Sequence, residues 1–231
     1  MGKTQHQVAA QIALLEKSQS QKFQNQSDEE ASRMLRCFFD VDGVVLDFES
    51  AYLRVISAYF QLDLPENFQT TRWDFSELLT EQQQLEGWEY FVNSNAFREL
   101  ESLVPAPRFN EVFGAYPVHF VTNIPPEHMD ARRENLSQVG YHFESVHPGG
   151  FLSFNEQPPR TKSQVIADLV QDGEQILFVD DHPRNCVDVK ESFPEAWVWL
   201  MSRPFNQDFD HPTIQRAKHW EQVLKSLPKV P

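Results

Sequence analysis

The sequence predicts an α/β fold built on a doubly wound, mainly parallel sheet. Short apolar runs, such as residues 37–39 and 176–179, alternate along the chain with amphipathic stretches of helical length. These runs are continuous in apolar residues, which is typical of parallel strands buried on both faces. Two of the runs end directly in acidic residues. Because the helices that connect parallel strands return the chain to the same end of the sheet, the carboxyl ends of these strands should lie along one edge.

Length and charge narrow the possible functions. The chain of 231 residues can bury one hydrophobic core and carry a small accessory domain. Its formal net charge of −14 argues against a nucleic-acid polymer or an anionic membrane surface as the main partner. A small phosphate ester remains compatible with this charge, because cations close to the site decide whether an anion binds. The composition predicts no particular oligomeric state, so an oligomer remains open.

The sequence also indicates a cellular location. No apolar run approaches the roughly 20 residues needed to span a bilayer, and the N-terminus lacks the apolar segment of a secretory signal. The two cysteines, Cys37 and Cys186, show no metal-binding or redox spacing. Cys37 lies in a predicted core strand, which favours a buried free thiol. We therefore expect a soluble cytoplasmic protein with no membrane partner.

The chain begins with a polar extension, residues 1–33, that is rich in Gln and Ser. Val8, Ile12 and Leu15 have the spacing of one helical face, which predicts a short helix followed by a polar linker. Such a helix could bind a partner protein, or it could dock loosely on its own chain. The second interpretation is favoured.

A first strand begins near Met34, and a helix is predicted at 48–60. The following segment, 61–112, contains helical patterns at 77–91 and 97–103 and little strand signal. It is too long for a simple crossover between two strands. The sequence therefore predicts a helical unit inserted after the first strand.

Within this insertion, Arg72 and Trp73 place a cation beside an aromatic ring. Such a pair could hold a ring and a charged group of a substrate. Alternatively, Trp73 and Phe75 could form the small hydrophobic core of the insertion. The sequence leaves both interpretations open.

The remaining elements follow from apolar runs and helical periodicity. Strands are predicted at 118–121, 143–146, 176–179 and 196–201, and helices at 109–115, 127–139, 162–170, 185–192 and 212–227. Strands that alternate with helices predict right-handed βαβ units with helices on both faces of the sheet.

The chemistry begins at the end of the first strand, where Asp40 and Asp42 flank Val41 and precede Gly43. In an extended chain the two carboxylates lie on one side, while Val41 points away. Two acids this close repel each other, so both ionise at low cost only with a cation or a proton between them. The pattern indicates a site, and a solvated turn is the alternative.

Three further residues or pairs follow in a fixed order. Thr122 ends the second strand, Lys162 opens a helix, and Asp180-Asp181 ends the fourth strand. The order of Asp, Thr, Lys and paired Asp resembles the four motifs of the haloacid dehalogenase superfamily. Receiver domains of response regulators use a similar set with the acidic pair first, so chain order argues against them.

This resemblance implies a Rossmann-like catalytic core, formed by residues 34–49 and 113–231, and a small helical cap over 50–112. It implies a phosphatase in which Asp40 is the nucleophile that forms an aspartyl-phosphate. Mg²⁺ would be held by Asp40, by the main-chain carbonyl of Asp42 and by one of Asp180 and Asp181, with either acid possible. Asp42 would be the general acid and base, with a pKa raised by crowding among carboxylates.

The other residues of the motifs are expected to bind the phosphoryl group. Thr122 and Asn123 offer donors to phosphoryl oxygens, and Lys162 offers a positive charge to the same oxygens. Asn185 is expected to orient the acids from behind. Taken singly, Thr122 could be a helix cap and Lys162 an exposed lysine, but the order of the motifs favours the site.

Within the superfamily, the sequence is similar to the 5'(3')-deoxyribonucleotidase-like branch. The similarity lies in residues 40–48, in the strand ending 179–181 and in the tail segments 203–206 (Arg-Pro-Phe-Asn) and 219–221 (His-Trp-Glu). Asn123 stands where this branch often has Ser, and the cap matches poorly. A nucleoside monophosphate is therefore a hypothesis for the substrate. The alternative is a catalytically weak protein of the same fold that binds a protein partner, and the full set of motif residues argues against it.

Overall fold

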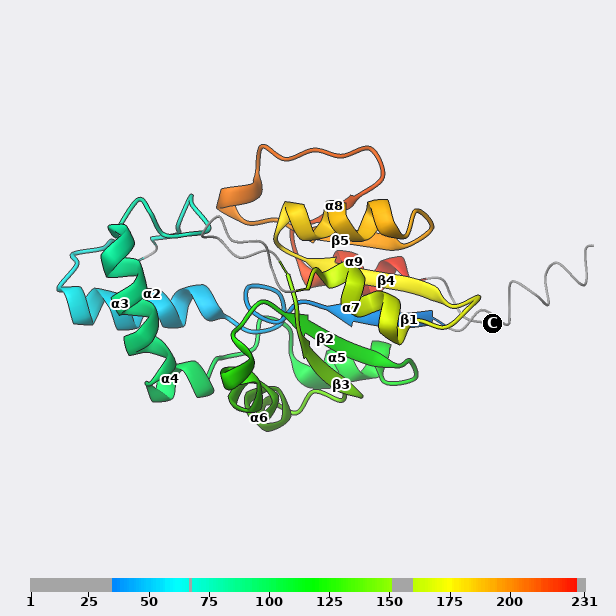
Figure 1. Ribbon diagram of the computed structural model, residues 1–231, viewed down its shortest axis with the longest axis horizontal. Coiled ribbons are helices and arrows are strands. Elements are labelled where there is room, and N and C mark those ends of the chain that lie inside the picture. Colours follow the sequence, from blue (N-terminus) through cyan, green and yellow to red (C-terminus); the bar gives the residue numbers. More distant parts are fainter. Residues whose placement is uncertain (1–34, 67, 151–159, 228–231) are drawn as a thin grey trace, which may run out of the picture. The chain divides into compact units, whose positions relative to one another are not determined.

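The computed structural model describes residues 35–66, 68–150 and 160–227. The N-terminal extension predicted for residues 1–33 lies outside this range. The described chain forms a six-stranded sheet in the order β3-β2-β1-β4-β5-β6, and all neighbouring strands are parallel (Figure 1). The strands are β1 (Leu35–Phe39), β2 (Val118–Thr122), β3 (Ser145–Pro148), β4 (Gln175–Asp180), β5 (Trp197–Met201) and β6 (Gln215–Ala217). The predicted Rossmann-like α/β fold is confirmed.

Helices cover both faces of the sheet. The side chains of β1 alternate between these two covered faces, which explains its continuous apolar sequence. Cys37 and Phe39 pack into one core with α5 (Ala106–Phe113), α6 (Met129–Val139) and α9 (Trp220–Ser226). Phe38 points to the opposite face and packs into a second core with α7 (Lys162–Leu169) and α8 (Pro183–Ser192). Every residue of β1 is therefore buried.

The strand order reverses at β1, which lies between β2 and β4. In open parallel sheets, the carboxyl ends of the strands at such a switch point form the usual binding crevice. All the motif residues found in the sequence lie at or just after the ends of β1, β2 and β4, or begin α7. The topology therefore brings them to one edge.

Between β1 and β2 the described residues form a helical insertion with α2 (Phe48–Phe60), α3 (Glu81–Val92) and α4 (Asn95–Arg98) (Figure 1). Its aromatic side chains pack on one another, with Tyr52 against Phe75 at 4.8 Å and against Phe91 at 5.2 Å between ring centroids. The two connections to the sheet run side by side, because Asp47 N donates to Glu101 O at 2.8 Å.

Several element boundaries differ from the predicted ones. The helix predicted at 77–91 begins at Glu81, because Thr80 caps it and its side chain accepts from Gln83 N. The helix predicted at 97–103 is the short α4, and the strand predicted at 143–146 covers Ser145–Pro148. Helix α5 falls mostly within the range predicted for the cap, yet its Phe109 and Phe113 pack against Phe39 of the sheet.

The predicted helix at 212–227 is the largest error. Its first part is β6, which pairs with β5 through Met201 opposite Ala217, and only Trp220–Ser226 is helical. The short polar segment Gln215–Ala217 carries little strand signal of its own. The open edge of β5 decides its conformation, since it offers unpaired backbone groups.

No helix in the described part of the chain is long and apolar enough to cross a membrane. Cys37 is free and buried, as predicted, and Cys186 is also free and buried.

Candidate active site

The loop after β1 brings Asp40 and Asp42 to the carboxyl edge of the sheet. Asp40 N donates to Val179 O of β4 at 2.9 Å, so the chain stays in register with its neighbour up to the first carboxylate. Gly43 then turns the chain with a φ of +75°. A Cβ atom at this position would lie 2.2 Å from Asp181 Oδ2. Position 43 therefore needs glycine for its backbone angle and for the close approach of Asp181.

Lys162 lies between two of the acids. Its Nζ is 2.7 Å from Asp40 Oδ1 and 2.6 Å from Asp180 Oδ2, and the lysine side chain is fully buried. Thr161 begins α7 with a capping box, which sets where the lysine emerges. Burial alone lowers the pKa of Lys162, but the charges of Asp180 and Asp40 raise it above its usual value. This lysine is charged and is not the exposed residue of the alternative interpretation.

Three buried carboxylates meet at the same place. Oxygen atoms of Asp40, Asp180 and Asp181 all lie within 4.8 Å of one another. Burial, followed by the charge of Asp180, raises the pKa of Asp40 to about 7 against the effect of Lys162. Burial and the charges of Asp40 and Asp180 also raise the pKa of Asp181 well above its usual value. Three acids facing one lysine leave an excess of negative charge, and hard oxygen ligands of this kind suit Mg²⁺.

The two acids at the end of β4 differ in their surroundings. Asp180 accepts from His182 N at 2.7 Å and from Asn185 Nδ2 at 3.1 Å, in addition to its contact with Lys162. Asp181 is 3.9 Å from Arg203 Nε. Asn185, which was expected to orient the acids, contacts Asp180. The carboxylate of Asp181 has fewer contacts with protein side chains than that of Asp180.

The second carboxylate of the β1 loop points to a different partner. Nη2 of Arg132, on α6, lies 3.0 Å from Asp42 Oδ1 and donates to Oδ2 at 3.2 Å. Burial raises the pKa of Asp42, while the charges of Arg132 and Lys162 lower it. Carboxylate crowding was the predicted cause of a raised pKa, and this cause was wrong, because Asp42 faces the arginine.

Sequence reasoning missed Arg132. The residue is fully buried, although α6 contains many polar side chains. A signal was present: Met129, Arg132 and Leu136 are spaced three and four residues apart, as on one face of a helix, and all three are buried. An arginine in line with core residues indicates a buried charge that needs a carboxylate partner.

Thr122 and Asn123 follow at the end of β2. Thr122 is fully buried, and its Oγ1 has no hydrogen-bond partner among the described residues. A buried hydroxyl without a partner is costly unless a ligand completes it. A Cβ atom on Gly150 would lie 3.0 Å from Lys162 Cε and 3.2 Å from Asn123 Cβ, so both side chains pack closely against that glycine.

The two tail segments that suggested the branch brace the site. Asn206 Nδ2 donates to Asp181 O at 2.7 Å, and Arg203 Nε donates to Gly43 O at 3.1 Å. Trp220 Nε1 donates to Val44 O at 2.8 Å. The tail therefore fixes both the acidic loop after β4 and the loop that carries Asp40.

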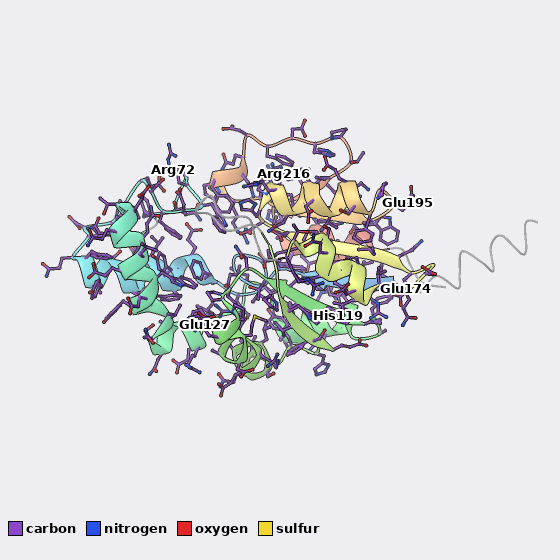
Figure 2. The ribbon with its side chains drawn as sticks, viewed as in Figure 1. Arg72, His119, Glu127, Glu174, Glu195 and Arg216 are labelled. Carbon is purple, nitrogen blue, oxygen red and sulfur yellow. The ribbon has the colours of Figure 1, made fainter. Side chains whose placement is uncertain are left out.

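Arg72 and Trp73 lie at a cavity of about 320 Å³ that also contacts His182, the residue after Asp181. The cavity is lined by Thr71, Arg72, Trp73, Asp74, His182, Arg184 and Phe205. The Trp73 ring meets the His182 ring edge to face at 5.0 Å. Phe75 instead packs among the rings of the helical insertion. The two aromatic residues thus have different roles: Phe75 belongs to the core of the insertion, and Trp73 lines the cavity with Arg72. Arg72 is labelled in Figure 2.

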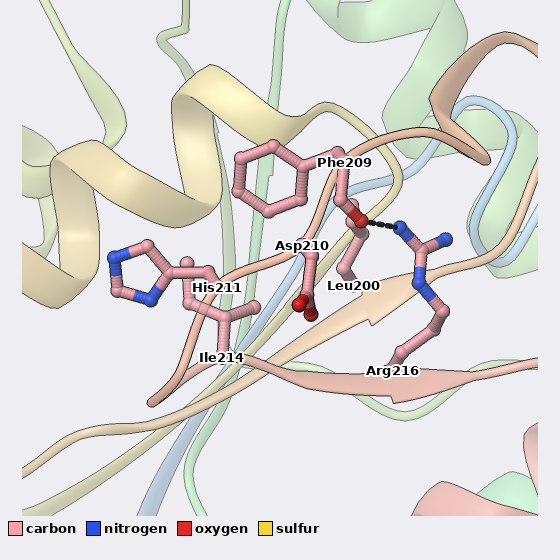
Figure 3. A pocket seen from close by; sticks show the side chains of 6 residues that line it. All are labelled: Leu200, Phe209, Asp210, His211, Ile214 and Arg216. Atoms are coloured by element: carbon pink, nitrogen blue, oxygen red, sulfur yellow. Dashed lines mark hydrogen bonds between the residues drawn. The ribbon is translucent and has the colours of Figure 1, made fainter.

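A second cavity, of about 20 Å³, lies beside β5 and β6 (Figure 3). Leu200, Phe209, Asp210, His211, Ile214 and Arg216 line it, and Arg216 donates to the carbonyl of Phe209. Its volume holds about one water molecule. We assign it no binding role.

Comparisons with known proteins agree with this geometry. Residues 33–227 match the family described as 5' nucleotidase, deoxy (pyrimidine), cytosolic type C protein. No curated protein matches the sequence.

Among solved structures, a haloacid dehalogenase-like hydrolase from Streptococcus pneumoniae matches with a TM-score of 0.56 at 15% identity, covering 84% of this chain and 98% of that one. The HAD hydrolase YfnB from Bacillus subtilis, described as bound to magnesium, matches with a TM-score of 0.52 at 15% identity. This match covers 84% of this chain and 98% of that one. A protein from Haemophilus somnus, described as a predicted phosphoglycolate phosphatase, matches with a TM-score of 0.54 at 18% identity. This match covers 83% of this chain and 97% of that one. At these identities the structural matches support the fold.

Proposed function

Because this chain belongs to the cytosolic type C 5'-deoxynucleotidase family, and is thus a phosphatase of the haloacid dehalogenase superfamily, we propose that it hydrolyses small phosphate monoesters with Mg²⁺ through an aspartyl-phosphate. The observation that carries this proposal is the meeting of Asp40, Asp180 and Asp181 around one buried lysine. This arrangement provides a nucleophile, a cation site and a fixed positive charge at one edge of the sheet.

Asp40, the carbonyl of Asp42 and an acid of the Asp180-Asp181 pair would hold the metal. Asp181 is the better candidate for direct contact, because Asp180 is already engaged by Lys162, Asn185 and His182 N. Bound there, Mg²⁺ supplies positive charge that lets an anionic ester approach a carboxylate. A structural neighbour from Bacillus subtilis is described as bound to magnesium, which supports the choice of ion.

The protein residues would then act in two steps. The Asp40 carboxylate attacks phosphorus, the bond from phosphorus to the ester oxygen breaks, and Asp42 gives its proton to the departing alcohol. A water molecule next attacks the aspartyl-phosphate and passes its proton to Asp42, which releases phosphate and restores Asp40. Lys162 neutralises charge on the phosphoryl oxygens. The partnerless hydroxyl of Thr122 and the amide of Asn123 would donate to the same oxygens.

For the substrate, we propose a nucleoside monophosphate, with its base in the cavity of about 320 Å³. Trp73 and Phe205 offer ring surfaces to a flat base, and Arg72 and Arg184 offer donors to its carbonyl oxygens. The name of the matched family, a nucleotidase, supports this choice and also a cytoplasmic location.

The test is a panel of phosphate monoesters with Mg²⁺, compared between the wild type and Asp40→Asn. We expect turnover that stops in EDTA and in the variant, with higher kcat/KM for nucleoside monophosphates than for sugar phosphates. Equal rates on both classes would remove the nucleotide as substrate and leave the phosphatase. Absence of turnover with every divalent cation would favour the alternative of a binding protein that meets a protein partner.

A further inference from the structure

Arg132 has contacts that suit more than a structural role. We propose that Arg132 is a positioning residue: it orients the Asp42 carboxylate toward the leaving-group oxygen and ties that orientation to the helical insertion. This inference rests on the proposed function, because it concerns the step in which Asp42 protonates the departing alcohol.

On one side, Arg132 holds the carboxylate. A single nitrogen, Nη2, lies 3.0 Å from Asp42 Oδ1 and 3.2 Å from Oδ2, so both oxygens face the guanidinium. The arginine side chain is fully buried, whereas that of Asp42 is 18% exposed. A charged contact of this kind holds the carboxylate against the guanidinium, while part of the Asp42 side chain stays exposed.

On the other side, Arg132 holds the insertion. Its Nη1 donates to Phe97 O at 3.1 Å, and its Cζ lies 4.5 Å from the centroid of the Phe97 ring. One helical turn further, Asn135 exchanges two hydrogen bonds with the backbone of Leu100, at 3.1 and 3.2 Å. Residues 97–100 are thus anchored to α6, and a shift of this segment must move the guanidinium that holds Asp42.

The cost of this arrangement also argues for a role beyond stability. Arg132 Nε is buried and has no hydrogen-bond partner among the described residues. A buried donor without a partner is destabilising, and a well-packed apolar residue would avoid this cost. The other cation of the site, Lys162, pairs with Asp40 and Asp180. The site therefore has a phosphoryl side served by the lysine and a leaving-group side served by the arginine.

The dependence of rate on the leaving group tests this proposal. Proton donation accelerates departure of an alkoxide strongly, by about 10²- to 10⁴-fold, and matters little for 4-nitrophenolate, which is stable as an anion. We expect Arg132→Lys to lower kcat/KM for an alkyl phosphate at least about tenfold more than kcat/KM for 4-nitrophenyl phosphate. The matched control is Arg133→Lys, because the neighbouring Arg133 is exposed and pairs with Asp130. This control variant should leave the ratio unchanged.

A double variant strengthens the test. In an Asp42→Asn background, Arg132→Lys should change the ratio no further, because the carboxylic acid that Arg132 positions is no longer present. Equal losses on both substrates in Arg132→Lys would overturn the positioning role and indicate general damage. Activity of the wild type on neither substrate would instead overturn the proposed function.

A milder variant covers the case in which Arg132→Lys does not fold. Phe97→Leu removes the ring beneath the guanidinium and keeps the carbonyl that accepts from Arg132. We expect it to lower the same ratio by about two- to fivefold, in line with the strength of a cation–ring contact. An unchanged ratio in the folded Phe97→Leu protein would overturn the link between the insertion and Asp42.

Discussion

Two buried clusters of charge lie on the same sheet and differ in their balance. The first is the acidic cluster of Asp40, Asp180 and Asp181 with Lys162, at the carboxyl ends of the strands. The second joins Arg36 near the start of β1, His119 in β2 and Glu174 just before β4 (His119 and Glu174 are labelled in Figure 2).

In the second cluster every charge has its counterpart. Arg36 donates to Glu174 through Nε at 2.7 Å and through Nη2 at 2.8 Å. Its Nη1 donates to His119 Nε2 at 2.8 Å, so Nε2 is the acceptor and the ring proton lies on Nδ1. His119 Nδ1 then donates to Ser145 Oγ at 2.7 Å. Each polar group thus has a partner from the protein itself.

The acidic cluster lacks this completeness. Three carboxylates face one buried lysine, with Arg203 Nε 3.9 Å from Asp181, and the hydroxyl of Thr122 at the same edge of the sheet has no partner among the described residues. Buried charge that the protein balances by itself stabilises one arrangement, whereas charge that it leaves unbalanced needs a ligand. The balance of a buried cluster, rather than its presence, separates the functional cluster from the structural one.

The largest expected effect on activity comes from removing the proposed nucleophile of the acidic cluster. Asp40→Asn should lower kcat on phosphate monoesters by at least about 10⁴-fold, because covalent catalysis is lost. Steady-state kinetics checks this, with circular dichroism to show that the fold is kept. A variant that retains a tenth of the wild-type rate would exclude Asp40 as the nucleophile.

The balanced cluster should give the opposite result. Arg36→Met leaves the buried Glu174 without its partner, so the free energy of unfolding should fall by about 3 kcal/mol. Urea unfolding measures this loss, and kcat of the folded protein at 25 °C should stay within about twofold of the wild type, because the cluster lies apart from the motif residues. A tenfold fall in kcat would mean that this cluster also takes part in catalysis.

The excess charge of the acidic cluster makes a third prediction. Asp181→Asn should raise the free energy of unfolding of the metal-free protein by about 1 kcal/mol, since it relieves repulsion from Asp40 and Asp180. Millimolar Mg²⁺ should raise the melting temperature of the wild type and have little effect on the variant. Thermal melting in EDTA and in Mg²⁺ measures both effects. A metal-free variant less stable than the wild type would show that the cluster is already balanced.

The last prediction concerns pH and the balanced cluster. Burial, and then the charge of Arg36, lower the pKa of His119 from 6.5 to about 4. In that window the unfolded chain binds a proton that the folded protein does not, so this residue's contribution to stability is present above pH 6.5 and is lost as the pH falls toward 4. Urea midpoints at pH 7 and pH 5 should differ less in His119→Gln than in the wild type. An equal difference in both proteins would assign the pH dependence to other groups.

The sequence predicted the parallel sheet and most of the motif residues because both depend on local pattern. A strand such as 37–39, apolar at every position, is buried on both faces whatever surrounds it. The end of such a strand then fixes where Asp40, Thr122 and Asp180 lie. Segment 215–217 could not be predicted in the same way, because the neighbouring strand, and not its own residues, makes it a strand.

The sequence by itself determined which acids and which lysine meet, since chain order on a parallel sheet leaves one edge for all of them. Only the tertiary structure decided how the charges pair. Arg132 and Arg133 are adjacent and chemically identical, yet one is buried against Asp42 and the other pairs with Asp130 on an exposed face. The rotation of α6 against the sheet and the insertion makes this choice, and packing between distant segments sets that rotation.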